Sequence, residues 1–210
     1  MTTLPKPSQM PYFSLTDKEA GYLADTDFLR TKTEIYRKTD QLLAVTQEGL
    51  QECIRQRNPS FGPEVLTRGG KISRGENYRL LPYHVLDYPR HFATNDVFAL
   101  RTMVWWGNHL SLTLHLAGHS LSRHRPSLQS NLRQLQDWGW QVCVGTDPWQ
   151  YVQDNDYYLS AHQWSADKWP GWLEKRDFCK FSVFLSLAQW DQLPKEAVIF
   201  LDKIMTILGL

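Results

Sequence analysis

Two kinds of hydrophobic pattern alternate along the chain. In 14–56 apolar residues recur at steps of three, four and seven, which places one stripe on an amphipathic helix of about seven turns. The stripe consists of Phe28, Ile35, Leu42, Leu43, Leu50 and Ile54. Thr16 and Glu19 have the spacing of a capping box, so a short helix is predicted before the long one. Asp25 or Asp27 can cap the long helix.

From residue 97 the period changes to two, which is typical of β-strands. The predicted strands are Val97–Trp106 and Leu110–Ala117. Gly107 and Asn108 between them predict a hairpin turn. A two-residue turn pairs Arg101 with Leu114, whereas a three-residue loop sets Arg101 across from His115. The sequence leaves the register open, and with it the question of which face carries Arg101 and His115.

The remaining patterns indicate an α+β protein. A third strand is predicted over Tyr83–Tyr88, closed by Pro89. The other predicted elements are a helix over 127–138, strands over Trp140–Val144 and Phe181–Ala188, and a final helix over Lys195–Leu208. We therefore expect N-terminal helices, a mainly antiparallel sheet of about five strands with one inserted helix, and a C-terminal helix. The proline-containing segment 1–13 is predicted to be an extended arm, and 14–210 a single domain.

Composition and charge exclude several classes of protein. A formal net charge of +1 argues against a general nucleic-acid binder. Segment 1–13 lacks the apolar core of a signal peptide, and three scattered cysteines without a CxxC pair fit a reducing compartment. Residues 102–122 carry no formal charge, but apolar and polar residues alternate there, which favours a hairpin over a membrane-spanning helix. We expect a cytoplasmic, tryptophan-rich protein that binds neither membranes nor nucleic acid; a homo-oligomer is left open.

The candidate binding site lies in the middle of the chain. Residues 68–135 hold nine Lys and Arg residues against three acidic ones, although the whole chain is nearly neutral. Within 69–90 a paired glycine is followed by four cations, and arginine can clamp a carboxylate or phosphate with two hydrogen bonds. We therefore expect a small anionic ligand beside the central sheet. The predicted ligand-binding residues are Lys71, Arg74, Arg79 and Arg90, with Tyr83 and Trp106 as walls.

Known motifs do not identify a reaction. A phosphate-binding P-loop needs a glycine at position 65 and a Ser or Thr at position 72, where the chain has Val65 and Ile72. His115, His119 and His124 suggest a metal site, but nothing indicates that they converge, so no metal and no cofactor is expected. The chain has no GxSxG motif, and no catalytic residue is assigned.

Two alternative functions remain open. The aromatic-rich segment 146–176 could form the contact surface of a protein–protein interaction or self-assembly module. The other alternative is an enzyme that uses His84 or His115 as an acid or base. A pair of His84 and Asp87 is disfavoured, because residues three apart point to opposite faces of a regular strand.

Three segments resemble an uncharacterised bacterial protein family. They are LTDKEAGYLADTDFLRTKTEIY, GGKISRGENYRLLPYHVLDYPR and FALRTMVWWGNHLSLTLHLAG. The resemblance implies a bacterial, intracellular protein. It implies no activity, substrate or cofactor, and it assigns no catalytic residue.

Overall fold

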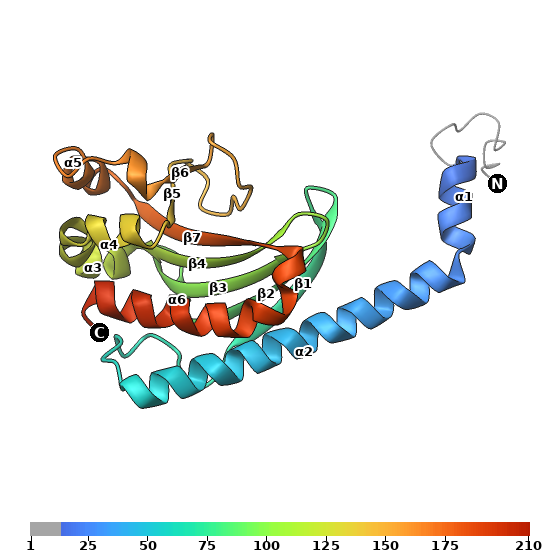
Figure 1. Cartoon of the computed structure of the whole chain (residues 1–210), viewed down its shortest axis with the longest axis horizontal. Coiled ribbons are helices and arrows are strands. Elements are labelled where there is room, and N and C mark those ends of the chain that lie inside the picture. Colours follow the sequence, from blue (N-terminus) through green and yellow to red (C-terminus); the bar gives the residue numbers. More distant parts are fainter. Residues whose placement is uncertain (1–13) are drawn as a thin grey trace, which may run out of the picture. The chain divides into compact units, whose positions relative to one another are not determined.

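The computed structural model describes residues 14–210, so the predicted arm over 1–13 lies outside the described residues. The chain forms two compact units, of which the first ends at Thr39 and the second is Asp40–Leu210. The prediction of one domain over 14–210 stays a prediction. The helices are α1 (Asp17–Ala24), α2 (Thr26–Arg57), α3 (Gly118–Ser130), α4 (Leu132–Asp137), α5 (Trp169–Glu174) and α6 (Leu193–Leu208), with short 3-10 turns η3 (Ala161–Gln163) and η4 (Leu187–Gln192) (Figure 1). The strands are β1 (Lys71–Tyr78), β2 (Leu81–Ala93), β3 (Asp96–Trp105), β4 (His109–Ala117), β5 (Gln141–Cys143), β6 (Tyr158–Ser160) and β7 (Phe178–Ser186).

The first unit contains the two predicted N-terminal helix starts. Thr16 and Glu19 form the predicted capping box, in which the Glu19 carboxylate accepts a 2.7 Å hydrogen bond from the Thr16 backbone N–H. Asp25 separates α1 from α2, and its carboxylate accepts a 2.9 Å hydrogen bond from the Phe28 N–H. Both caps pair backbone donors that a helix start otherwise leaves unpaired.

The second unit is built on one antiparallel sheet in the order β1-β2-β3-β4-β7-β5-β6. The predicted α+β class is confirmed, but the sheet has seven strands rather than about five. The two strands that the sequence pattern missed, β1 and β6, lie at the edges. β1 reads KISRGENY and is largely exposed, while β6 has only three residues, so neither shows the apolar alternation of a buried strand.

Two predicted boundaries were wrong for local reasons. β2 does not close at Pro89 but continues to Ala93, because a register shift between Asp87 and Arg90 lets pairing with β3 resume beyond the proline. The helix predicted over 127–138 begins at Gly118 and is interrupted at Asn131.

The β3–β4 register settles which residues share a face. The connection is a three-residue loop over 106–108, and Arg101 pairs with Thr113 rather than with Leu114 or His115. Because paired residues lie on the same face and every second residue follows them, Arg101, Thr113 and His115 share one face of the sheet.

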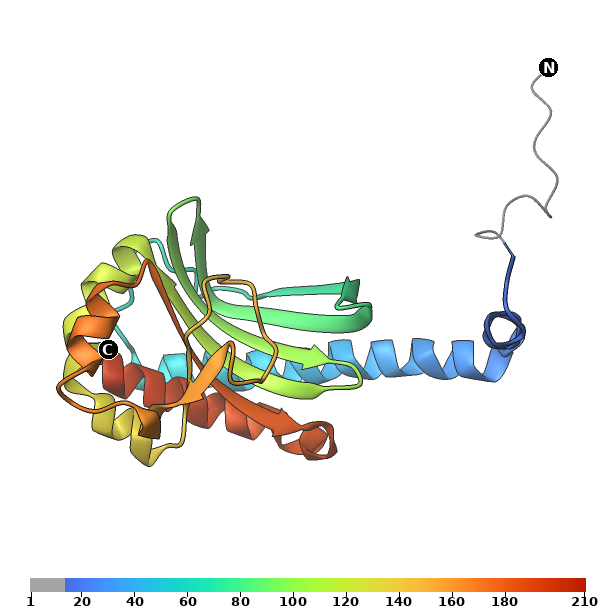
Figure 2. The ribbon, with the colours of Figure 1, turned by 90° about the horizontal axis from the view of Figure 1, so that it is seen from above.

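The two faces of the sheet have different covers. One face packs against α6 and residues 40–57 of α2, and this layer holds the main core, including Leu43, Leu50, Leu112 and Phe200. Figure 2 shows the segment between β5 and β6 crossing the other face. We call residues 144–157 the roof loop. Within the described part of the chain, no helix has the length and apolar character needed to cross a membrane.

Candidate ligand cleft above a buried polar row

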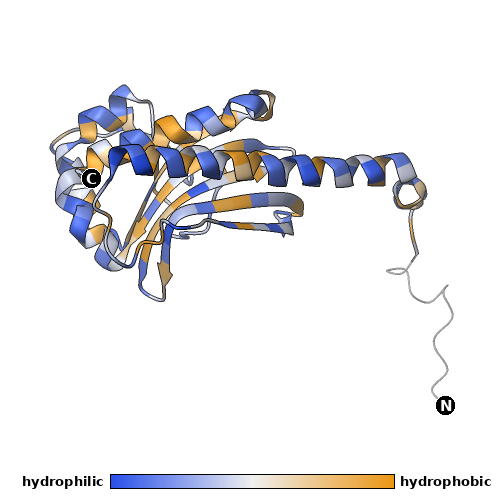
Figure 3. Cartoon of the chain, turned by 90° about the horizontal axis from the view of Figure 1, so that it is seen from below, coloured by the Kyte–Doolittle hydropathy of each residue, from blue (hydrophilic) through white to orange (hydrophobic). Residues whose placement is uncertain are grey.

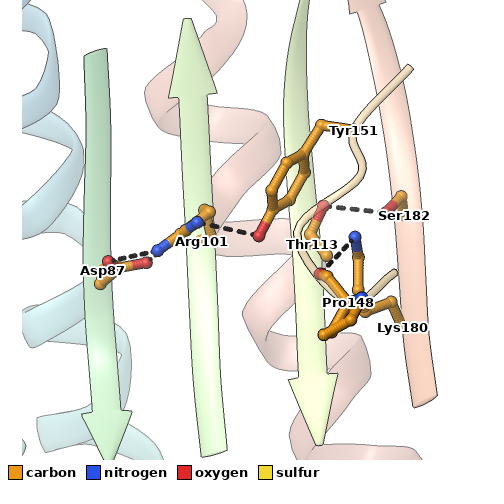
Figure 4. Close-up of polar contacts among 7 residues, drawn as sticks. All are labelled: Asp87, Arg101, Thr113, Pro148, Tyr151, Lys180 and Ser182. Carbon is orange, nitrogen blue, oxygen red and sulfur yellow. Dashed lines mark hydrogen bonds and ion pairs between the residues drawn. The ribbon is translucent and has the colours of Figure 1, made fainter. Parts of the chain in front are cut away.

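A row of polar side chains crosses the face beneath the roof loop. Asp87 of β2 pairs with Arg101 of β3, Arg101 with Thr113 of β4, and Thr113 with Ser182 of β7. The hydroxyl groups of Thr113 and Ser182 lie 2.8 Å apart and share a buried hydrogen bond (Figure 4). We call these four residues the polar row.

The charge of Arg101 is paired inside the row. Its Nε and Nη2 atoms donate to the two carboxylate oxygens of Asp87 at 2.7 and 2.9 Å, and its Nη1 donates to the Tyr151 hydroxyl at 2.9 Å. Burial alone would lower the pKa of Arg101, but the hydrogen bonds and the negative charge of Asp87 raise it. The guanidinium therefore stays charged and ties β3 to both β2 and the roof loop.

Lys180 holds the roof loop from the other side. This residue of β7 has no exposed surface, and its ammonium group donates to the carbonyl oxygen of Pro148 at 2.9 Å (Figure 4). The same group also donates to the carbonyl oxygen of Gln150. The ammonium also lies 3.9 Å from the centre of the Tyr151 ring. Burial, with a smaller contribution from the positive charge of Arg101, lowers the pKa of Lys180 to about 8. No carboxylate in the described part of the chain forms an ion pair with Lys180.

An open cleft of about 880 Å³ lies beside this row. Its walls come from the β2–β3 hairpin (92–97), the end of β4 (His115 and Ala117), the first residue of α3 (Gly118), the roof loop (Pro148 and Trp149), and Asp177 with Phe178 at the start of β7. Most of these side chains are apolar. The centres of the Phe92 and Trp149 rings lie 6.4 Å apart, and both rings remain partly exposed at 38% and 48%. We call this the hairpin cleft.

His115 is the buried polar residue of the hairpin cleft. It is 3% exposed, and its ring lies edge-on to Trp149 and Phe178 at 5.5 and 5.9 Å between ring centres. Burial, followed by the charges of Lys180 and Arg101, lowers the pKa of His115 to about 3. The imidazole is therefore neutral at physiological pH. Its Nε2 atom has no hydrogen-bond partner among the described residues.

The acidic residues at the cleft differ in their pairing. Asp96 accepts a 2.8 Å hydrogen bond from the Ser120 N–H and lies 3.3 Å from Nε2 of His91. This arrangement joins the β2–β3 hairpin to the start of α3. Asp177 lies at the edge of the cleft beside Phe178 and adds negative charge there.

The residues predicted to bind a ligand are distributed over both faces of the sheet. Lys71 pairs with Asp87 at the edge strand β1, and Tyr83 lies on the same face, with its ring 6.0 Å from that of Tyr78. Arg74 of β1 is paired with His84 of β2, and both lie on the opposite face. The Nη1 atom of Arg74 lies 3.4 Å from a carboxylate oxygen of Asp40.

The other three predicted residues also lie apart from one another. Trp106 stacks on His84 at 6.2 Å, on the face that packs against the helices. Arg79 lies in the β1–β2 turn and donates to the Tyr157 hydroxyl at 3.3 Å. Arg90 lies beyond the register shift in β2, where its backbone pairs with Leu66. The structure thus does not bring the six residues into one pocket, and their role in binding a ligand stays a prediction.

The histidines considered for catalysis or metal binding are also separated. Nε2 of His84 lies 3.6 Å from a carboxylate oxygen of Asp40 on one face of the sheet, whereas Asp87 binds Arg101 on the other. His84 and Asp87 are three residues apart in β2, so their side chains point to opposite faces, as expected. Residues 14–210 contain no cluster of three or more His, Cys, Asp or Glu side chains that could hold a metal ion.

Two of the residues that do converge have a weak signal in the sequence. Each of the apolar strand sequences FALRTMVW and FCKFSVFL contains a single charged residue, Arg101 and Lys180. A lone charge in a buried strand needs a partner, so both residues could have been selected as members of a polar site. Their shared partner, the roof loop with Tyr151, has no sequence pattern that indicates where it folds.

Comparisons with models of known protein families, with curated proteins and with solved structures found no match to the chain. The resemblance to an uncharacterised bacterial family therefore stays a prediction.

Proposed function

We propose that the protein binds a small molecule in the hairpin cleft, with an apolar body and a single carboxylate or similar anionic group. The observation that carries this proposal is the cleft of about 880 Å³ with aromatic walls and the neutral His115 at its buried side. Clefts of roughly 300–1,000 Å³ with mainly apolar walls and a few polar groups are typical of small-molecule sites.

The aromatic walls favour an apolar or planar ligand body. Trp149 and Phe92 offer partly exposed ring faces, and Val97 and Phe178 extend the apolar lining. Contact with such rings displaces water from both surfaces and also allows offset stacking. The Arg101 guanidinium lies over the Trp149 ring, 5.4 Å from the ring centre. This contact helps to hold the ring in place.

The charges around the cleft favour one negative group on the ligand. Lys180 and Arg101 disfavour a proton on His115, and the same positive potential favours an anion beside the ring. His115 contributes a neutral imidazole to the buried wall of the cleft, and its unpaired Nε2 atom is itself buried. Asp96 and Asp177 disfavour a ligand with several negative charges, such as a nucleotide.

The enzyme alternative has less support. A general acid or base works best with a pKa near the working pH, whereas the pKa of His115 is lowered to about 3 by burial. His115 is thus poorly suited to proton transfer near neutral pH. We therefore place ligand binding before acid–base catalysis.

The proposal is tested with a panel of small aromatic monocarboxylates and their matched primary amides, titrated by calorimetry. We expect at least one carboxylate to bind about tenfold more tightly than its amide, a difference of about 1.4 kcal/mol. Trp149→Ala should weaken that binding about tenfold or more, because it removes one aromatic wall. Leu80→Ala, at a residue that is 85% exposed in the β1–β2 turn, is the control and should bind as the wild type does. A panel in which no carboxylate binds, or in which Trp149→Ala has no effect, would contradict the proposal.

A further inference from the structure

Residues 14–39 carry an apolar surface with no core of their own. No residue of α1 is buried. The exposed apolar side chains of this unit are Leu15, Tyr22, Leu23, Phe28, Leu29 and Ile35, each between 38% and 67% exposed. Figure 3 shows such apolar positions recurring along α2 between hydrophilic ones. We call these six residues the arm stripe.

The spacing of the arm stripe is that of a packing surface. Within the stripe, Leu15, Tyr22 and Leu29 recur at seven-residue steps, as do Phe28 and Ile35, and the first series continues along α2 through Tyr36 to Leu43 and Leu50. Leu43 and Leu50 belong to the second unit, where both are fully buried. A seven-residue repeat keeps side chains on one side of a helix, as in paired helices. An isolated helix as short as the eight-residue α1 is also marginal in water, so it gains from a partner.

The charges of this unit are divided between its two halves. Residues 14–27 hold four acidic residues and one lysine, and residues 28–39 hold four basic residues and one glutamate. The acidic half therefore has a formal charge of −3 and the basic half +3. Residues 14–39 together are neutral, which does not favour an anionic membrane surface or nucleic acid as their partner.

We propose that the arm stripe binds a second copy of this chain in an antiparallel arrangement. An antiparallel pair sets the acidic half of each copy against the basic half of the other, and a two-fold axis makes both contacts at once. A parallel pair would place like charges together. The apolar stripe supplies the buried area, and the charge division selects the orientation.

The first test is sedimentation equilibrium of the full chain over a concentration series. We expect a reversible dimer. The variant Phe28→Ser/Ile35→Ser should weaken the dimer at least about tenfold, because it removes two apolar contacts of the stripe from each copy. The control is Val45→Ser, which removes an apolar side chain of α2 that is 53% exposed and lies outside the stripe, and it should leave the dimer unchanged. All nine tryptophans lie beyond residue 104, so tryptophan fluorescence verifies that the second unit of each variant is folded.

The second test determines the orientation. Arg30→Glu/Lys38→Glu should weaken an antiparallel dimer, and adding Asp17→Lys/Asp27→Lys should restore it, because the second pair of changes returns opposite charges to each contact. In a parallel dimer the first variant would reduce repulsion and tighten the association. A strictly monomeric wild-type chain, a dimer that Phe28→Ser/Ile35→Ser does not weaken, or tightening by Arg30→Glu/Lys38→Glu would overturn the proposal.

Discussion

The Lys180 ammonium group donates a 2.9 Å hydrogen bond to the carbonyl oxygen of Pro148, and this contact joins β7 to the roof loop. The loop carries Trp149, one wall of the hairpin cleft, directly after the proline. A charged group buried within the sheet therefore fixes the position of a residue that we propose contacts the ligand.

Replacing Lys180 by methionine should loosen the roof loop. Methionine fills a similar volume but leaves the carbonyl oxygen of Pro148 without its donor, so we expect a loss of about 1–3 kcal/mol in the free energy of unfolding. Hydrogen exchange of the backbone amides over 149–152 should become faster than in the wild type. Lys175→Met, at an exposed position, is the control and should change neither quantity.

Lys180→Met should also change how the free energy of unfolding depends on pH. Burial lowers the pKa of Lys180 to about 8, below the ordinary value of 10.5 that the unfolded chain has. Between these two values the unfolded chain binds a proton that the folded chain does not, so raising the pH through this window stabilises the fold by up to about 1.4 kcal/mol per pH unit. Urea denaturation at pH 8 and pH 10 should show this increase in the wild type relative to Lys180→Met. An equal pH dependence of the two proteins would be evidence against a buried ammonium.

The pair of Asp87 and Arg101 should behave as one unit. Removing either charge leaves the other buried, so Asp87→Asn or Arg101→Met should each cost about 3–5 kcal/mol of stability. The double variant should cost clearly less than both single losses together, because no unpaired charge remains. A double-mutant cycle by chemical denaturation measures this coupling, and simple additivity would contradict the buried ion pair.

Acid should destabilise the fold through two histidines of the face beneath the roof loop. Burial lowers the pKa of His109 to about 4 and that of His115 to about 3, while the ordinary value is 6.5. As the pH falls below 6.5 the unfolded chain binds these protons first, so stability is lost from there down to the folded pKa values. We expect a loss of about 1–2 kcal/mol per histidine between pH 7 and pH 5. His109→Gln/His115→Gln should have a flatter pH dependence; an unchanged slope would show that other groups cause the acid sensitivity.

A glycine shapes the hairpin cleft. Gly118 has φ of +58°, and an added Cβ would lie 1.7 Å from the carbonyl oxygen of Asn95 in the β2–β3 hairpin. Gly118→Ala should therefore cost at least about 2 kcal/mol of stability and displace one wall of the cleft. Gly139→Ala is a matched control, because Gly139 also has a positive φ (+67°) but has no neighbouring atom within 4 Å of the added Cβ. It should cost only about 1 kcal/mol, so equal losses in a thermal unfolding experiment would contradict the predicted clash.

Local patterns were enough to predict most of the secondary structure but not the site. The capping box at Thr16 and the final helix depend on neighbouring residues, and both were predicted correctly apart from a two-residue difference at the start of α6. The face that carries Arg101 and His115 depends on the β3–β4 register, which a change of one residue in the hairpin loop would reverse. Pairing of Asp87 with Arg101, and of Lys180 with the roof loop, joins residues far apart in the sequence. The predicted Arg74 and Trp106 were selected for charge and aromatic character alone, and these properties do not say to which face a side chain points.

The most direct test of the proposed ligand cleft is an NMR titration that follows the indole N–H signals of the nine tryptophans. Addition of the best carboxylate from the binding panel should shift the Trp149 signal, assigned by its loss in Trp149→Phe, more than any other indole signal. Trp164, which packs against Trp169 and Trp172 away from the cleft, should not shift. A saturable shift centred on Trp149 is the result that our account predicts. Saturable binding that leaves Trp149 unchanged would place the ligand elsewhere and contradict it.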